Sequence, residues 1–387
     1  MNILYTAPVA TRSGYGDKSR DIASYLFKKY TEKSIDILST RWGECSLDGL
    51  SSESELNTKI LQNTLIGPPE KSPDISIHVA MPSEFKALGK YNIGITSGVE
   101  VDTCPESFIY GCNRMNLVIV PSEFTKQTLT DTEFASGIKC TTPIEVVFEG
   151  YTPEITDNTT EVEMSTLLDT INEEFCFLSV GQWAADSDRK NIRGLVNVFN
   201  DTFRDVKNPP ALVLKIYGSS HCISDELEIK KQLYSILSTN SNHAPIYVVY
   251  GNVTPSEMTT LYSHSKIKCL VSLTRGEGFG RPLLEASVNG LPIMVSKWSG
   301  HLDFLDKKLC KLLPGTHITA TGLGEFAPTD AKWFDVDLNN VSVELVDMVS
   351  RYEVHESRAT KLRKINSQKY SIESMHTAYD NVLSKYI

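Results

Sequence analysis

Short apolar runs alternate with amphipathic segments along the whole chain. In the first half the apolar runs lie at 2–6, 35–39, 75–80, 92–97, 117–120 and 144–148. In the second half they lie at 175–180, 211–217, 246–250, 269–273 and 291–295. Apolar runs of this length, separated by helix-like segments, are typical of βαβ units and parallel sheets. The pattern therefore predicts an α/β protein.

Capping side chains mark where several helices are expected to begin. In the first half, Asp17 and Ser122 stand in cap positions before amphipathic segments. In the second half, Asn191 precedes an apolar stripe with helical spacing, and residues 254–257 read Thr-Pro-Ser-Glu. The latter is a capping box with proline at the first helical position.

Two polar stretches interrupt the alternation and suggest how the chain is divided. Residues 40–73 are rich in serine and predict a loop, and residues 152–172 separate the last run of the first half from the next. A chain of 387 residues suits two domains. We expect Rossmann-like domains at 1–172 and 173–368, followed by a final helix at 369–387.

Composition and charge narrow the class of protein. With 41% apolar and 22% charged residues, the chain has the make-up of a soluble globular enzyme, and no apolar run is long enough to span a membrane. We expect a cytoplasmic protein with free, buried thiols such as Cys176 and Cys269, because the eight cysteines form no Cys-x-x-Cys pair. Residues 1–172 hold 14 basic against 24 acidic side chains, which argues against a polyanionic partner.

The most informative segment is 275–285, which reads Arg-Gly-Glu-Gly-Phe-Gly-Arg-Pro-Leu-Leu-Glu. It lies between a predicted strand and a helix, at the sheet edge where ligands bind. The helix N-terminus favours an anion, and Gly276, Gly278 and Gly280 let a phosphate come close. Glu277 and Glu285 are acceptors for vicinal hydroxyls, so the segment predicts a nucleotide sugar as ligand. The structural alternative is that Glu285 complements the helix dipole and Glu277 is a solvated loop residue.

Glu277 and Glu285, with seven residues between them, resemble the Glu-x7-Glu motif of retaining glycosyltransferases with the GT-B fold (glycosyl transferases group 1, family four type). The resemblance implies two Rossmann-like domains facing across a cleft, with Glu285 on the donor ribose and Glu277 on the transferred sugar. Gly278, Phe279, Gly280 and Val253 would complete the donor site. Residues 181–191 resemble the diphosphate-binding segment of the family, with Arg189 and Lys190 as its cations and Gln182 where the family often has arginine.

Other segments resemble the same family in the expected order. Gly14 and Gly16 resemble a glycine loop that approaches the donor from the first domain. Glu100 and Asp102 follow a predicted strand and are candidate acceptor contacts, whereas His78 falls inside a strand and is predicted to be a core residue. His301 lies in a segment that resembles a loop near the sugar. The resemblance further implies that the last helix returns to the first domain.

The function implied by the resemblance is retaining transfer of a sugar from a nucleotide-diphosphate sugar to a hydroxyl. Arg189, Lys190 and the helix N-terminus would stabilise the departing diphosphate, with Glu277 as the third catalytic residue. We expect no cofactor and no metal, since we assign no Asp-x-Asp pair to a metal site. The acceptor stays open among saccharides, lipid-linked sugars, small molecules and hydroxymethylated bases of phage DNA, as does the oligomeric state. The alternatives are a nucleotide-sugar epimerase and a non-catalytic nucleotide-sugar-binding protein.

Overall fold

The computed structural model describes residues 1–31, 34–50, 54–67, 69, 71–153, 158–183, 188–218, 222–238 and 242–386. The chain divides into two compact units. One comprises Met1–Gly150, Leu323–Ala331 and Ile372–Ile387, and the other comprises Tyr151–Gly322 and Lys332–Ser371. The first boundary thus lies after Gly150, earlier than the expected 172. The reason is that α5 (Asn158–Asp169) packs against α8 (Pro255–Ser263) of the second unit.

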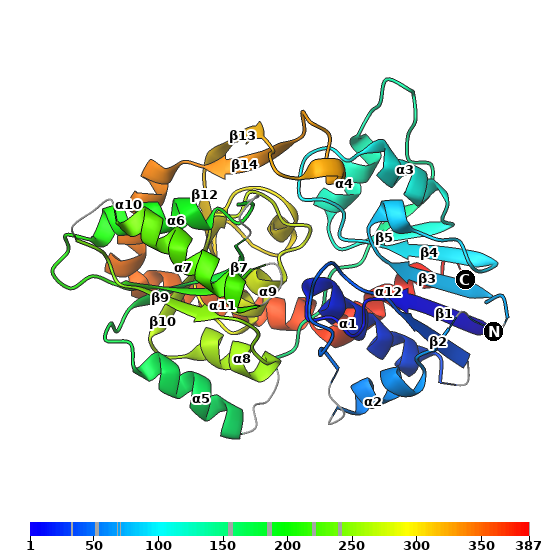
Figure 1. The fold of residues 1–387 in the computed structure, drawn as a ribbon, viewed down its shortest axis with the longest axis horizontal. Coiled ribbons are helices and arrows are strands. Elements are labelled where there is room, and N and C mark those ends of the chain that lie inside the picture. Colours follow the sequence, from blue (N-terminus) through cyan, green and yellow to red (C-terminus); the bar gives the residue numbers. More distant parts are fainter. Residues whose placement is uncertain are drawn as a thin grey trace. The chain divides into compact units, whose positions relative to one another are not determined.

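The described strands of the first unit form a six-stranded parallel sheet in the order β2-β1-β3-β4-β5-β6 (Figure 1). All six predicted runs are strands. Their bounds are β1 (Asn2–Ala7), β2 (Ser34–Ser39), β3 (Ile75–Val79), β4 (Tyr91–Ile95), β5 (Leu117–Val120) and β6 (Ile144–Val146).

The helices of the first unit differ from expectation at two places. Ser13, and not Asp17, caps the first helix, because its side chain accepts from the N–H of Gly16. The predicted loop 40–73 contains a helix capped by Ser54, whereas Ser122 caps its helix as predicted. The helical segments are α1 (Gly14–Lys29), α2 (Glu55–Gln62), η1 (Pro82–Glu84), α3 (Glu106–Asn113), α4 (Glu123–Asp131), η3 (Gly324–Phe326) and α12 (Ile372–Leu383).

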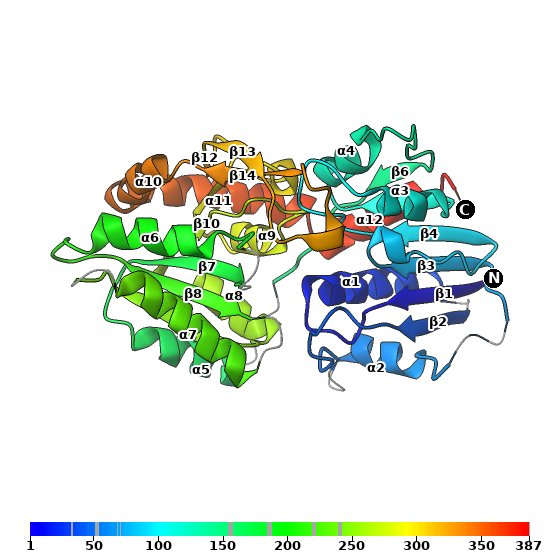
Figure 2. The same cartoon turned by 45° about the horizontal axis from the view of Figure 1, so that its top comes forward.

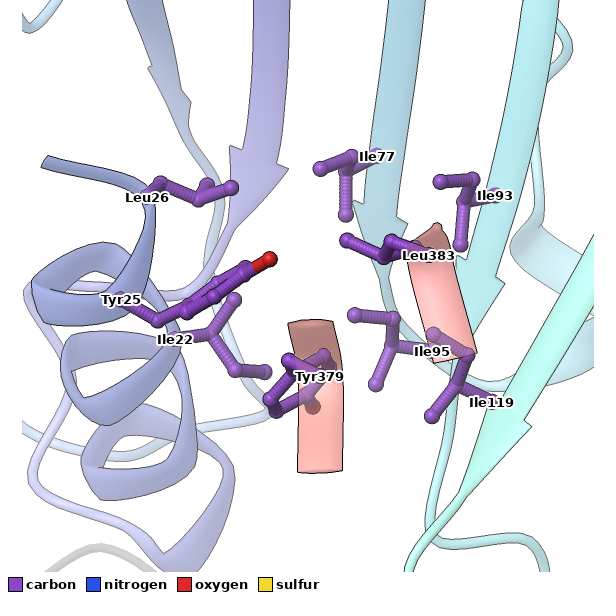
Figure 3. Close-up of a pocket in the computed structure, with 9 residues that line it drawn as sticks. All are labelled: Ile22, Tyr25, Leu26, Ile77, Ile93, Ile95, Ile119, Tyr379 and Leu383. Atoms are coloured by element: carbon purple, nitrogen blue, oxygen red, sulfur yellow. The ribbon is translucent and has the colours of Figure 1, made fainter. Parts of the chain in front are cut away.

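The C-terminal helix α12 completes the core of the first unit. Its buried stripe includes Met375, Tyr379 and Leu383, which pack with α1 and the sheet. Figure 3 shows Tyr379 and Leu383 facing side chains of α1 and the strands around a cavity of about 10 Å³, lined by Ile22, Tyr25, Leu26, Ile77, Ile93, Ile95, Ile119, Tyr379 and Leu383. An apolar cavity of this size stays dry. The predicted final helix therefore belongs to the core of the first unit.

The second unit has a parallel sheet in the order β12-β11-β10-β7-β8-β9. In its register, Leu270 pairs with both Leu178 and Ile293. Strand β12 and the antiparallel hairpin β13-β14 were not predicted. The strands are β7 (Cys176–Gln182), β8 (Ala211–Tyr217), β9 (Ile246–Tyr250), β10 (Ile267–Ser272), β11 (Ile293–Ser296), β12 (Lys311–Leu313), β13 (Gly315–Thr319) and β14 (Lys332–Val336).

Helix α6 is the centre of the core on one face of this sheet. It packs between α7 and α10 and lies along β7, where Phe199 contacts Phe177 (Figure 2). The predicted capping box of α8 is present, formed by Thr254 and Glu257. The remaining helical segments are α6 (Ile192–Phe203), α7 (Ile223–Leu237), α9 (Arg281–Val288), η2 (Gly300–Asp303), α10 (Leu338–Ser350) and α11 (Tyr352–Lys369).

The strand order of the second unit is that of a doubly wound Rossmann fold, and the order of the first is flavodoxin-like. The prediction of two Rossmann-like domains is confirmed. In the second unit the order reverses between β7 and β10, and in doubly wound sheets ligands bind at this point, outside the carboxyl ends of the strands. Among the described residues, no helix is both long and apolar enough to cross a bilayer.

Candidate active site

The loops after β7 and β10 are joined at the point where the strand order reverses. The N–H of Arg275 donates to the carbonyl of Arg189 at 2.8 Å, and Nη1 of Arg189 donates to the carbonyl of Gly276 at 2.5 Å. The predicted diphosphate segment and the glycine loop therefore form one structure. Residues 184–187 of that segment lie outside the described residues.

Two predicted cations converge on a predicted carboxylate in this structure. Nζ of Lys190 lies 2.5 Å from Oε1 of Glu277, and Nη1 of Arg189 lies 3.5 Å from Oε2. Glu277 is 7% exposed, so it is not the solvated loop residue of the structural alternative. Gly181 makes room for the lysine stem, since a Cβ there would stand 3.2 Å from Cγ of Lys190.

Glu277 is held as an anion. Burial acts to raise the pKa of its carboxyl, but the charges of Lys190 and Arg189 outweigh burial and lower the pKa to about 2. Two cations against one carboxylate leave the group formed by Arg189, Lys190 and Glu277 with a net positive charge. Such a group suits an anionic ligand.

The backbone of Glu277 is fixed by a turn whose importance the sequence reading missed. The N–H of Glu277 donates to Oγ of Ser299 at 2.9 Å, and the N–H of Gly300 donates to the carbonyl of Glu277 at 3.0 Å. Ser299 has φ of 84°, a left-handed conformation that is uncommon for a residue with a side chain. Its serine-glycine pair was the signal in the sequence, since such pairs mark turns.

His301 is buried next to this turn. Its Nε2 lies 2.8 Å from the carbonyl of Ser296, and burial lowers the pKa of the ring, which makes it a neutral donor at Nε2. Nδ1 is then an acceptor, and it is buried without a hydrogen-bond partner. His301 packs against the glycine loop, because a Cβ on Gly280 would stand 3.2 Å from Cβ of His301.

Helix α9 begins at the glycine loop without a side-chain cap. Its N-cap residue, Gly280, has φ of 96°, and its carbonyl accepts from the N–H groups of Leu283 and Leu284. Phe279 is buried against Phe304, with ring centroids 4.9 Å apart, and anchors the loop. Gly278 is buried as well. This helix start is the expected anion-binding element.

Glu285 lies one turn into α9, and both oxygens of its carboxylate accept hydrogen bonds. Its Oε1 accepts from Nε of Arg281 at 3.1 Å, and its Oε2 accepts from the hydroxyl of Tyr262 at 3.0 Å. Burial and the nearby carboxylate raise the pKa of Tyr262, so the phenol stays a donor. These contacts orient the carboxylate that the resemblance assigns to the donor ribose.

The side chain of Arg275 links the glycine loop to the loop after β7 and to β14, a role that the sequence did not reveal. Its Nε donates to Asp335 of β14 at 2.8 Å, and its Nη1 donates to the carbonyl of Asp188 at 2.8 Å. Asp188 in turn caps α6, because its carboxylate accepts from two N–H groups at the helix start. Asn191, the predicted cap, has φ of 52° and makes no side-chain cap. Asn191 thus occupies the predicted cap position, but the side-chain cap comes from Asp188.

Asp335 and Asp337 form an Asp-x-Asp pair at the end of β14. Asp335 binds Arg275, and Asp337 caps α10 by accepting from the N–H of Asn339. Both aspartates therefore have structural roles. Among the described residues, no group of three or more histidine, cysteine or acidic side chains is arranged to hold a metal ion.

Val253 lies at the end of β9, in a loop held by a buried lysine. Nζ of Lys215 donates to the carbonyl of Gly251 at 2.5 Å, and Gly251 has φ of 95°. Burial lowers the pKa of Lys215 to about 8. Val253 itself is half-buried. The loop is thus fixed in place.

The remaining predicted residues belong to the first unit. Gly14 is exposed with open space around it, whereas a Cβ on Gly16 would stand 2.0 Å from the carbonyl of Thr11, so Gly16 is needed for packing. Glu100 is half-buried and Asp102 is exposed. Three threonine hydroxyls hold the loop of Glu100 and Asp102 against α4. Oγ1 of Thr125 donates to the carbonyl of Ser97, and Oγ1 of Thr128 donates to the carbonyl of Val101. Oγ1 of Thr132 accepts from the N–H of Cys104. His78 is buried, as expected for a core histidine.

Comparison with known proteins identifies the part of the chain that holds the two loops. Residues 170–318, which lie within the second unit, match the model of one protein family. The family is described as glycosyl transferases group 1, and we call the matching segment the group 1 domain. No curated protein matches the chain in sequence.

Solved structures similar to the whole chain agree with the group 1 domain. HepE from Anabaena, solved in complex with UDP and glucose, is 12% identical over 100% of both chains, with a TM-score of 0.64. Sucrose-phosphate synthase from Thermosynechococcus elongatus is 12% identical over 100% of this chain and 98% of that one, with a TM-score of 0.66. A glycosyltransferase from Rickettsia africae is 13% identical over 99% and 98%, also with a TM-score of 0.66. At these identities the likeness shows the GT-B fold, and the prediction of a glycosyltransferase is confirmed by the group 1 domain.

Proposed function

We propose that the chain transfers a sugar from a nucleotide-diphosphate sugar to a hydroxyl of an acceptor, with retention of the anomeric configuration. The observation that carries the proposal is the convergence of Arg189 and Lys190 on Glu277 inside the group 1 domain. The complexes of HepE with UDP and glucose and with UDP-glucose support a nucleotide sugar as donor.

Each charged group has a part in the proposed reaction. The net positive charge of the group and the uncapped start of α9 stabilise the charge that develops on the departing diphosphate. Ionised Glu277 accepts hydrogen bonds from hydroxyls of the transferred sugar. The acceptor hydroxyl attacks on the same face as the bond to phosphate breaks, so no protein nucleophile is needed. Because protein cations neutralise the diphosphate, we expect turnover to be insensitive to a metal chelator.

The test is release of nucleotide from a panel of UDP-, GDP- and ADP-sugars, with and without saccharide, lipid-linked and hydroxymethylated DNA acceptors. We expect release that depends on an acceptor and a product that keeps the configuration of the donor. An inverted product would refute retention. An epimerised donor would favour the epimerase, and donor binding with no turnover for any acceptor would favour a non-catalytic binding protein.

Site variants test the assignment of the residues. Glu285→Ala should mainly raise KM for the donor, and Lys190→Ala should mainly lower kcat, because the lysine serves charge that develops during the reaction. Arg193→Ala is the matched control, since Arg193 is exposed on the neighbouring helix α6. Unchanged kinetics in both site variants would refute the assignment.

A further inference from the structure

Two cysteines of the first unit, Cys112 and Cys140, lie near each other and outside the group 1 domain. Cys112 lies in the last turn of α3, and Cys140 lies in the segment between α4 and β6. Each thiol shifts the pKa of the other, and Sγ of Cys140 donates to the carbonyl of Thr142 at 3.7 Å. Cys112 is buried and Cys140 is half-exposed, so only one of the two thiols is open to a reagent from solution.

The backbone around the two cysteines is held by hydrogen bonds on both sides of Cys140. Nδ2 of Asn113 donates to the carbonyl of Lys139 at 2.9 Å, and its Oδ1 accepts from the N–H of Thr141 at 2.8 Å. Oγ1 of Thr142 donates to the carbonyl of Cys112 at 2.9 Å. These contacts keep the loop against the end of α3, so the thiols stay together without help from a ligand.

The pair divides into a reactive thiol and its partner. The neighbouring Cys112 thiol lowers the pKa of Cys140 to about 7, whereas Cys140 and burial raise the pKa of Cys112. Cys140 is therefore the more readily ionised of the two thiols. Low pKa, partial exposure and an adjacent second thiol are the properties of redox-sensitive cysteines.

We propose that Cys140 and Cys112 form a reversible disulfide when the protein meets a hydroperoxide. The Cys140 thiolate attacks the peroxide, which forms a sulfenic acid and releases hydroxide. Cys112 then attacks the sulfenic sulfur, the S–S bond forms, and the hydroxyl leaves as water with the proton of Cys112. With hydrogen peroxide as oxidant, two thiols and one peroxide give one disulfide and two waters. A dithiol reductant reverses the reaction.

A third thiol lies close enough to serve as an alternative partner. Cys104 interacts electrostatically with Cys140, but it is buried, and burial raises its pKa to about 11. Its N–H and thiol are both directed at Oγ1 of Thr132. We therefore assign the disulfide to Cys112, whose carbonyl is bonded by Thr142 in the segment that carries Cys140.

The test is peptide mapping by mass spectrometry after treatment of the full chain with one equivalent of hydrogen peroxide at pH 7. We expect one crosslinked peptide pair that joins Cys112 to Cys140, lighter by about 2 Da and lost on reduction with dithiothreitol. Before the crosslink forms, Cys140 should react faster than Cys45, a half-exposed thiol whose pKa is raised by burial.

Two variants complete the experiment. Cys112→Ser should leave a sulfenic acid on Cys140 that dimedone traps, whereas Cys45→Ser, the matched control, should form the crosslink as the parent does. A crosslink between Cys104 and Cys140, or a Cys140 thiol that survives peroxide while Cys45 is oxidised, would overturn the proposal. Both outcomes are read from the parent protein, so the test does not depend on whether the variants fold.

Discussion

Lys190 and Glu277 form an ion pair whose side chains are only 12% and 9% exposed, with Nζ of the lysine 2.5 Å from Oε1 of the glutamate. Taking both charges out of water costs about as much as their attraction returns, so such a pair adds little to stability. Removing one partner leaves the other as a buried charge with less compensation. The stability contributed by Lys190 therefore depends on Glu277 and the reverse, whereas their proposed roles in the reaction are separate.

A double-variant cycle separates these two effects. Lys190→Met and Glu277→Gln should each lower the free energy of unfolding, by up to about 3 to 5 kcal/mol. In Lys190→Met, Nη1 of Arg189 still lies 3.5 Å from Oε2 of Glu277, so the loss of unfolding free energy should be near the lower end of this range. The double variant should recover part of this loss, because the most deeply buried charge pair is removed as a whole and only the more exposed Arg189 loses the Glu277 carboxylate, but it should not recover nucleotide release. Urea unfolding and the release assay measure the two effects, and additive losses of stability would contradict the coupling.

Two glycines of the first unit should respond differently to the same substitution. Gly16→Ala places a Cβ 2.0 Å from the carbonyl of Thr11, so the backbone must shift and stability should fall. Gly14→Ala meets no atom within 4 Å and should change stability by less than about 1 kcal/mol. If Gly14 lets the loop approach the donor, this variant should keep its melting temperature and raise the donor KM. An unchanged KM would remove Gly14 from the donor site.

The sequence predicted the strands of both sheets well because buried parallel strands are continuous apolar runs. It failed for elements that depend on distant partners. The hairpin of β13 and β14 has exposed residues along β13, so no apolar run marks it. Helix α5 lies in a polar stretch that looks like a linker, and its packing against α8 is a tertiary contact.

The candidate site shows the same limit. Glu277, Glu285, Arg189 and Lys190 were found because glycines and charges follow strands at informative spacings. The residues that hold them were missed, because their partners are distant in sequence. Arg275 donates to Asp335, 60 positions later, and Oγ of Ser299 accepts from the N–H of Glu277, 22 positions earlier. Helix capping by Asp188 was missed because it acts from three positions before the expected cap residue. Local spacing does not encode such contacts.

Leu383 on α12 tests how much the C-terminal helix contributes to the first unit. It is 4% exposed and faces the core beside an existing cavity (Figure 3). Leu383→Ala should enlarge that cavity and lower the free energy of unfolding by about 2 to 5 kcal/mol. Leu61→Ala, at a position on α2 that is 50% exposed, is the matched control and should change it by less than about 0.5 kcal/mol. Equal effects of the two substitutions would show that α12 is not part of the core.

Lys215 gives a prediction for the pH dependence of stability. Burial lowers its pKa from 10.5 to about 8, with Glu257 acting in the opposite direction, so the folded state loses this proton before the unfolded state does. Between pH 8 and 10.5 the unfolded state binds more protons at this site, and stability contributed by the site rises with pH. Below pH 8 the full penalty for the buried charge is present.

The comparison with Lys215→Met isolates this effect from tyrosines and cysteines, which titrate in the same range. In urea unfolding, the stability of the parent protein relative to the variant should rise by up to about 3 kcal/mol from pH 8 to 10.5. Lys297→Met is the control, since Lys297 is exposed and its variant should follow the parent at every pH. A difference between parent and Lys215→Met that stays constant with pH would mean that the ammonium is solvated or paired well enough to titrate as it does in the unfolded chain.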